Sequence, residues 1–183
     1  RYRFRNFALM VAVVGVCAAG AGFAASHEKD EGVHHLVSVV HGTKGNKKVR
    51  GVVHFTKHKD GVKVKARVKG LTPGKHGFHI HEYGDATKAD GTSAGGHYNP
   101  EGHKHGLPPS TPRHAGDLGN IKANSQGVAK FTKKVSNISV SGKKNAIVGR
   151  GVIVHAKEDD GGQPTGNAGS RIAQGVIGVA GGK

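Results

Sequence analysis

Residues 62–69 read VKVKARVK, in which every second side chain is apolar and the others are Lys or Arg. Residues two apart on a β-strand point to the same face of a sheet, so this pattern predicts a strand with one face buried and one in water. Residues 49–56 alternate in a similar way, and the pair Asp60-Gly61 between the two segments is a hairpin turn signal. Together the segments predict an antiparallel hairpin with a basic outer face.

The rest of the chain has the same character of short apolar segments separated by turns, with no helical periodicity. The composition includes 31 Gly and no Trp, which suits short strands joined by tight turns and disfavours a helical bundle. We therefore expect one all-β domain, an eight-stranded antiparallel Greek-key β-sandwich or barrel. The expected strands are residues 36–40, 49–56, 62–69, 77–82, 120–123, 128–135, 152–155 and 172–180.

Two long connections, residues 83–119 and 156–170, do not fit simple hairpins. Long loops without regular structure in a compact domain are usually functional or disordered. These two contain most of the chain's chemically informative residues, so we expect two long functional loops.

The amino-terminal segment is typical of a secretory signal, with Arg1, Arg3 and Arg5 ahead of an apolar stretch and small residues near Ala24. A membrane anchor is the alternative, but the stretch is short and rich in glycine. We expect a cleaved signal peptide at residues 1–25, a flexible polar tail at 26–35 and the folded domain at 36–183. The mature protein would then be secreted (extracellular, or periplasmic in a bacterium) without contact with the membrane. Cys17, the single cysteine, lies in the signal segment.

The chain is strongly basic, with 28 Lys and Arg against 12 Asp and Glu. Removing the first 25 residues removes three arginines and no acidic residue, which leaves a net charge of +13 with His neutral. Such a field attracts anions, whether small substrates, nucleic acid or sulfated polysaccharide. No nucleic-acid-binding fold and no stacking aromatic residues are evident, so we expect no nucleic-acid partner. An extracellular polyanion is a candidate partner, and a merely soluble basic surface is the alternative.

Histidines form the most informative constellation, with 14 in the chain. His79 and His81 lie two apart in GFHIHE and so project from one face of a strand, and His155 ends the apolar strand VIVH. Imidazole suits copper and zinc, and three His with one carboxylate match a closed tetrahedral zinc site. The first long loop offers such a set in the spacing H-x7-H-x8-H-x2-D: His97, His105, His114 and Asp117.

Six segments of the chain resemble the signature segments of eukaryotic-type copper–zinc superoxide dismutases. They occur in the order of that family, and the resemblance as a whole covers roughly residues 36 to 180. These segments are GFHIHEYGD, TSAGGHYNP, KHG, RHAGDLGN, VGRGVIVHAKEDD and TGNAGSRIAQGVIGVA.

The resemblance implies dismutation of superoxide to dioxygen and hydrogen peroxide, by copper redox cycling with a structural zinc. It implies that His97 bridges the two metals as an imidazolate. The segment KHG aligns with a zinc-ligand segment of the family, which favours His105 and leaves His103 outside the site. The implied ligands are His79, His81, His97 and His155 for copper, and His97, His105, His114 and Asp117 for zinc.

Three further residues take roles through the resemblance. Asp159 is expected to link one copper histidine to one zinc histidine, although a solvated acidic turn is the alternative. Arg171 is expected to receive the anionic substrate beside copper, and Thr165 to line the opposite wall of the channel. The second long loop is shorter than the family's usual one and lacks its charged middle, which leaves the steering of superoxide open.

The family also implies a homodimer and one disulfide between the first long loop and the last strand. The alignment places Gly91 and Gln174 at the two half-cystine positions, so this chain cannot form that disulfide. The expected dimer surface comprises Tyr83, Gly84, Val148, Gly149 and residues 176–179.

Two other functions are alternatives to the dismutation of superoxide. A non-catalytic copper- and zinc-binding or storage domain would need the same ligands but no arginine for a substrate, so Arg171 disfavours it. An extracellular polyanion binder would use the basic strands and could coexist with catalysis.

Overall fold

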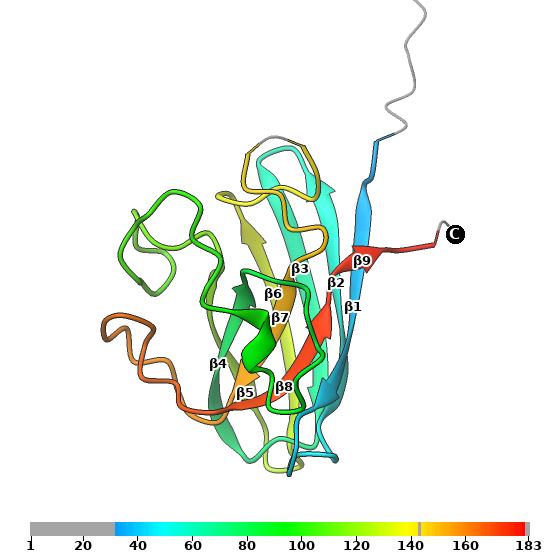
Figure 1. Cartoon of the computed structure of the whole chain (residues 1–183), viewed down its shortest axis with the longest axis vertical. Coiled ribbons are helices and arrows are strands. Elements are labelled where there is room, and N and C mark those ends of the chain that lie inside the picture. Colours follow the sequence, from blue (N-terminus) through cyan, green and yellow to red (C-terminus); the bar gives the residue numbers. More distant parts are fainter. Residues whose placement is uncertain (1–31, 143, 182–183) are drawn as a thin grey trace, which may run out of the picture. The chain divides into compact units, whose positions relative to one another are not determined.

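The structure is a computed structural model that describes residues 32–142 and 144–181. The expected signal peptide lies outside the described residues, as does most of the expected tail. Within the described part, nine strands form one antiparallel sheet in the order β2-β3-β6-β5-β4-β7-β8-β1-β9, and β1 also pairs with β2. That last pairing closes eight of the strands into a barrel (Figure 1). The strands are β1 (His35–Gly42), β2 (Arg50–His58), β3 (Gly61–Lys69), β4 (Gly74–His81), β5 (Asp117–Ala123), β6 (Val128–Val135), β7 (Gly151–His155), β8 (Arg171–Val176) and β9 (Gly178–Val179).

The topology is that of a Greek key. Strands β4, β5 and β6 are neighbours in order, while β3 pairs with β6 and β7 returns to pair with β4. The expected all-β antiparallel fold is therefore confirmed. The only helical element among the described residues is the short 3-10 helix η1 (Thr92–Ala94), and none of their helices is long and apolar enough to span a membrane.

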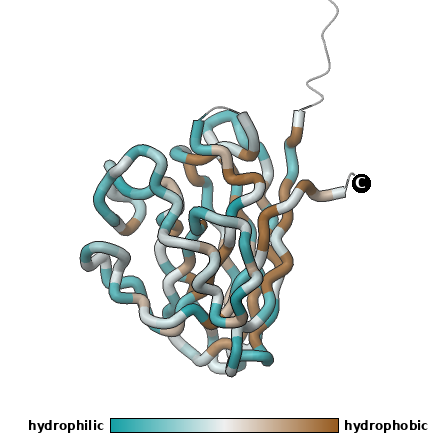
Figure 2. The backbone as a smooth tube through the Cα atoms, viewed as in Figure 1, coloured by the Kyte–Doolittle hydropathy of each residue, from teal (hydrophilic) through white to brown (hydrophobic). Residues whose placement is uncertain are grey.

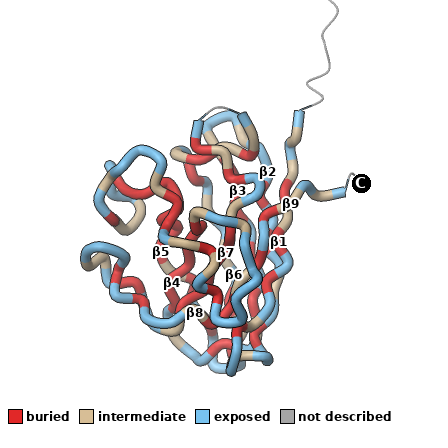
Figure 3. Tube along the Cα trace, viewed as in Figure 1, coloured by how far each residue is buried: buried red, intermediate tan, exposed pale blue. Residues whose placement is uncertain are grey.

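The period-two pattern fixes which side chains enter the barrel. In the β2–β3 hairpin the buried pair Phe55 and Val64 faces inward, and the next pair, His54 and Lys65, faces outward. The core continues through Phe78, Ile80 and Leu118, which have no exposed surface. Hydrophobic residues recur along the strands in Figure 2, and buried residues recur along them in Figure 3.

The expected strand at residues 172–180 is wrong as a single element. Strand β8 ends at Val176, and β9 resumes at Gly178 on the neighbouring strand β1. Between them the Ile177 N–H donates to the carbonyl oxygen of Arg150, and the Gly149 N–H donates to the carbonyl oxygen of Ile177. These bonds draw Ile177 away from the ladder and divide the strand.

The first long loop is hydrogen-bonded against β4 rather than standing away from it. The Tyr98 N–H donates to the carbonyl oxygen of Ile80 at 2.9 Å, and the Ile80 N–H donates to that of Gly116 at 2.9 Å. A Cβ at position 116 would collide with the Ile80 carbonyl oxygen, so a glycine permits this close approach. An isolated bridge between His81 and His97 continues the contact and brings a loop histidine beside a strand histidine.

Candidate metal centre

Two groups of potential metal ligands lie inside the described part of the chain. Within each group the candidate ligand atoms all lie within 4.8 Å of one another, and every member is buried. One group consists of four histidines, whereas the other has three histidines and a carboxylate. The groups are His79, His81, His97 and His155, and His97, His105, His114 and Asp117. These are the two sets that the sequence analysis expected.

The strands explain how the four-histidine group comes together. His79 and His81 leave β4 on one face, and β7 pairs with β4 through the register His79 with Ile153 and His81 with Gly151. The β7–β8 register shifts between Val154 and His155. His155 thereby reaches the same side, with its Nε2 at 3.4 Å from His81 Nε2.

Three histidines of this group each have one ring nitrogen that contacts a hydrogen-bond acceptor outside the group. His81 Nδ1 donates to the Gly95 carbonyl oxygen at 2.9 Å, and His155 Nδ1 donates to that of Gly169 at 3.1 Å. His79 Nε2 lies 2.8 Å from Asp159 Oδ2. The other nitrogen of each ring is left to point inward, and His79 Nδ1 is buried without any hydrogen-bond partner. A buried nitrogen without a partner is costly, so this arrangement fits a bound metal.

The second group is centred on one carboxylate oxygen. Asp117 Oδ1 lies 2.9 Å from His97 Nδ1, 3.0 Å from His105 Nδ1 and 3.2 Å from His114 Nδ1. Ligands at about 2.0–2.1 Å from a tetrahedral zinc lie about 3.3 Å apart, so these separations suit one such ion. His105 Nδ1 has no aligned hydrogen-bond partner despite its short distance to the carboxylate, as expected of two ligands of one metal.

His97 belongs to both groups. Its Nδ1 faces Asp117, and its Nε2 is buried without a hydrogen-bond partner. The His97 ring centroid lies 4.0 Å from that of His79 and 5.1 Å from that of His81. One imidazole can therefore contact an ion on each side.

Asp159 contacts one histidine of each group and so links the two groups. Its carboxylate, which is fully buried, places Oδ2 at 2.8 Å from His79 Nε2 and Oδ1 at 2.9 Å from His105 Nε2. This contradicts the alternative of a solvated acidic turn at that residue. A Cβ at position 166 would collide with the same carboxylate, so Gly166 leaves the space that Asp159 occupies.

Two residues that hold this arrangement were missed from the sequence. The Asn120 side chain exchanges two hydrogen bonds with the backbone of Asp159, each of 2.8 Å. The Gln163 side chain bonds to the backbone N–H and carbonyl of His105, which ties the two long loops together. Asn120 is the last residue of the family-like segment RHAGDLGN. That position is the only feature of the sequence that could have indicated a role for Asn120.

Burial determines the charge state of three members of the four-histidine group, namely His79, His81 and His155. It lowers the pKa of His79 to about 4 and that of His155 to about 3, and the pKa of His81 also falls well below its usual value. These imidazoles are neutral near neutral pH, which is the form that binds metal.

The carboxylates behave differently. Burial alone would raise the pKa of Asp117, but the adjacent imidazoles of His105 and His97 outweigh it and hold the pKa far below the usual range. Asp159 is held low in the same way by His105 and His79. Burial likewise works against a charged His105, yet the two carboxylates raise its pKa to about 9. Both carboxylates are therefore ionised and available as a ligand or hydrogen-bond acceptor.

Arg171, Thr165 and His103 complete the set of residues considered from the sequence. Arg171 starts β8 directly opposite His155 in the β7–β8 ladder, and its positive charge contributes to the lowered pKa of His81 and of His155. Its guanidinium donates to the carbonyl oxygens of Gly91 and Gly95 at 2.5 and 2.6 Å. Thr165 is exposed in the second long loop. His103 belongs to neither ligand group, and its Nε2 lies 3.8 Å from Glu101.

Comparison with known proteins identifies the family. The family described as copper/zinc superoxide dismutase (SODC) matches residues 49–177. An extracellular superoxide dismutase [Cu-Zn] of Onchocerca volvulus is 40% identical over 189 residues, covering 97% of this chain and 92% of that protein. The corresponding extracellular enzyme of Brugia pahangi is 40% identical and covers 79% of this chain and 75% of its own length.

A plant relative and a solved structure agree with this result. Superoxide dismutase [Cu-Zn] 2 of Mesembryanthemum crystallinum is 46% identical, covering 81% of this chain and 97% of the relative. The crystal structure of the clock protein EA4 superposes with a TM-score of 0.74 at 38% identity, covering 81% of this chain and 97% of EA4. The chain therefore belongs to the copper/zinc superoxide dismutase family and, with copper and zinc as cofactors, converts superoxide to dioxygen and hydrogen peroxide.

Proposed function

We propose that the four-histidine group holds the copper of this enzyme and that His97, His105, His114 and Asp117 hold its zinc. The observation that carries this proposal is the position of His97, with one ring nitrogen facing each group. An all-imidazole set suits copper, whereas three imidazoles and one carboxylate complete the four positions of a closed zinc site.

When bound, copper supplies the one-electron oxidation and reduction that dismutation requires, and zinc keeps a single oxidation state. Arg171 offers a fixed positive charge beside His155, because two backbone carbonyls hold its guanidinium in place. An anion such as superoxide is attracted to that charge. His97 Nε2, which lacks any partner within the protein, is the atom at which a proton can be held and passed to the reduced substrate.

Asp159 acts on both groups without binding metal itself. Its two oxygens accept hydrogen bonds from His79 and His105, which fixes the ring orientation of one copper ligand and one zinc ligand. A protein that only stored metal would need no positive charge held beside the copper ligands, so Arg171 favours catalysis over storage.

Metal analysis of two variants tests this assignment. His155→Ala removes a ligand of the four-histidine group alone, and we expect it to lose copper and activity while zinc stays bound. Asp117→Ala removes a ligand of the other group alone, and we expect it to lose zinc first. Loss of zinc from His155→Ala with retention of copper would reverse the assignment.

We also propose that the protein is secreted after cleavage of residues 1–25. Two relatives bear the name extracellular, and the first 25 residues have the composition of a signal segment. Expression of the full chain in a secreting host, followed by amino-terminal sequencing of the exported protein, tests this. A product that stays in the cell with residues 1–25 attached would contradict it.

The remaining partners are a second copy of the chain and an extracellular polyanion. Exposed apolar side chains at Tyr83, Val148 and Val176, with exposed fractions of 51%, 39% and 42%, support a homodimer through this surface. Sedimentation of the wild-type protein and of Val148→Glu tests it, because a buried charge should dissociate the dimer. The excess of positive charge supports the binding of an extracellular polyanion. The outer faces of β2 and β3 are the candidate surface for it.

A further inference from the structure

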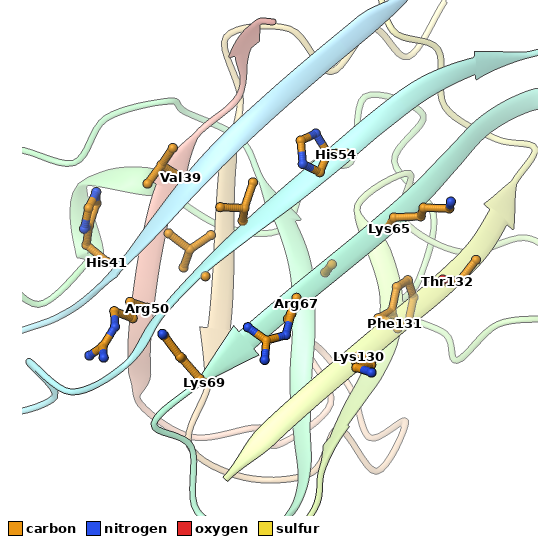
Figure 4. Close-up of a pocket in the computed structure, with 14 residues that line it drawn as sticks. Val39, His41, Arg50, His54, Lys65, Arg67, Lys69, Lys130, Phe131 and Thr132 are labelled. Atoms are coloured by element: carbon orange, nitrogen blue, oxygen red, sulfur yellow. The ribbon is translucent and has the colours of Figure 1, made fainter. Parts of the chain in front are cut away.

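The outer wall formed by β1, β2, β3 and β6 carries a dense group of cationic side chains, here called the basic face. A hollow of about 760 Å³ lies over this wall (Figure 4). Its margin includes Arg50, Lys65, Arg67, Lys69 and Lys130, and Figure 4 shows them arising from three adjacent strands. The basic face comprises these five residues together with Lys63 and Lys134, which point outward from β3 and β6.

Several of these cations lie directly opposite one another. The strand registers pair Arg50 with Lys69, Arg67 with Lys130, and Lys63 with Lys134. Residues directly opposite on antiparallel strands have Cβ atoms about 4.5–5.5 Å apart, and like charges there destabilise the sheet. The fold thus tolerates three unfavourable pairs on one wall.

The strands of the basic face carry no acidic residue of their own, since β2, β3 and β6 contain no Asp or Glu at all. The ion pairs of lysine that the structure describes involve Lys59, Lys75 and Lys144, none of which belongs to the basic face. An external anion would relieve this repulsion, so the wall has the charge of a binding surface.

The basic face lies apart from the metal centre. The metal ligands come from β4, β7, the first long loop and Asp117 at the start of β5, and β6 lies between β3 and β5 in the sheet. In Figure 1 the outer parts of the two long loops extend to the left of the barrel and β2 lies towards its right, while the part of the first loop that contains η1 crosses the front. A large ligand on this wall would therefore leave the approach to Arg171 open.

We infer that the basic face binds a linear sulfated polysaccharide and tethers the active enzyme to it. Residues two apart on a strand are separated by about 6.6 Å and adjacent strands by about 4.8 Å, so the cations form a repeating lattice that a polymer of regularly spaced anions can match. This inference rests on the proposed secretion, which places the enzyme where such polymers occur.

Other polyanions fit the wall less well. Binding of single-stranded nucleic acid relies on exposed aromatic rings that stack with bases. Phe131, the one Phe, Tyr or Trp among the residues that line the hollow, is partly buried and packs edge-on against Phe78 at 5.2 Å. The exposed apolar side chains on this wall are Val39 and Val52, too few for insertion into a membrane.

Two triple variants of the metal-loaded, full-length mature protein test the inference. Lys65→Gln, Arg67→Gln and Lys130→Gln together neutralise the centre of the basic face. Lys59→Gln, Lys88→Gln and Lys122→Gln remove the same charge from exposed sites elsewhere. The probe is heparin, with uncharged dextran as the blank and single-stranded DNA of matched charge as the competitor.

We expect the first triple variant to bind heparin about tenfold more weakly or worse, and the control to lose no more than about twofold. In the absence of heparin the two triple variants, which lose the same charge, should dismutate superoxide at the same rate. Equal weakening in the two triples would overturn the inference, because net charge alone would then explain the binding. Competition by DNA as strong as that by heparin would overturn the choice of polysaccharide.

A third variant separates this inference from the proposed function. His155→Ala should still bind heparin with wild-type affinity, although we expect it to lack copper and activity. Failure of heparin binding in an enzyme with normal activity would refute the basic-face site alone. Normal heparin binding with both metals and activity retained in His155→Ala would refute the copper assignment alone.

Discussion

Gly91 and Gln174 face each other where the first long loop contacts β8, so that a Cβ on Gly91 would lie 3.5 Å from Gln174 Oε1. These are the two positions at which the family resemblance places a disulfide. Here Gln174 Nε2 instead donates to the carbonyl oxygen of Lys88 at 3.1 Å. Arg171 adds hydrogen bonds to the carbonyl oxygens of Gly91 and Gly95. Hydrogen bonds therefore connect the first long loop to β8 at the place where the resemblance implies a disulfide.

The first prediction follows from this replacement. The chain has one cysteine, so no disulfide can form within it, and thermal unfolding should be insensitive to a strong reductant. Losing a disulfide that closes a long loop costs about 2–5 kcal/mol, and metal ligands from distant segments offer the compensation. We expect the melting temperature to fall sharply on removal of zinc and copper. A melting temperature lowered by reductant, or equal in the metal-free and metal-loaded forms, would contradict these claims.

The second prediction concerns Asp159, whose two oxygens serve His79 and His105. An amide has only one oxygen, so Asp159→Asn can accept from one of the two rings and must turn an NH2 group toward the other. We expect metal affinity to fall about 10–100-fold, as is usual when such a partner is lost. Competition with a chelator measures it. The control is Asp160→Asn, an exposed neighbour whose carboxylate accepts hydrogen bonds from Gly162 and Asn167. An equal loss of affinity in this variant would contradict the role of Asp159.

Features that depend on residues close together in the sequence were predictable, whereas features that depend on contacts between distant segments were not. The β2–β3 hairpin was predictable because period-two alternation and the Asp60-Gly61 turn are local signals. The ligand positions followed from a family resemblance, and the structure brings those eight ligand assignments into two buried groups. The division of the last strand at Ile177 was not predictable, and neither were the hydrogen bonds between Asn120 and Asp159. Each depends on a hydrogen bond to a segment distant in sequence.

The third prediction concerns the charge at Arg171. Arg171→Glu places a negative charge where we propose that superoxide docks, so we expect activity to fall about tenfold or more with both metals retained. Arg171→Lys keeps the charge but not the paired hydrogen bonds, and should be milder. Arg67→Glu makes the same charge reversal on the far wall of the barrel and serves as the control. An equal loss of activity in Arg67→Glu would show that net charge, rather than the position of Arg171, determines the rate.

The fourth prediction is that the dismutation rate falls as ionic strength rises. Without residues 1–25 the chain would carry a net charge of +13, and salt screens its attraction for superoxide over about 10 Å at 0.1 M. Pulse measurements of the rate across a salt series test this. A rate independent of salt would show that the shortened second loop leaves the channel without steering, despite the charge of the whole protein.

The central claim is that copper held by the four-histidine group carries out the dismutation. It is tested most directly by preparing the metal-free protein, loading it with zinc, and measuring superoxide dismutation while copper is added in steps. The account predicts no activity before copper and a linear rise that stops at one copper per chain, with no rise in the His155→Ala variant. Full activity of the zinc-only protein, or an equal rise in His155→Ala, would contradict it.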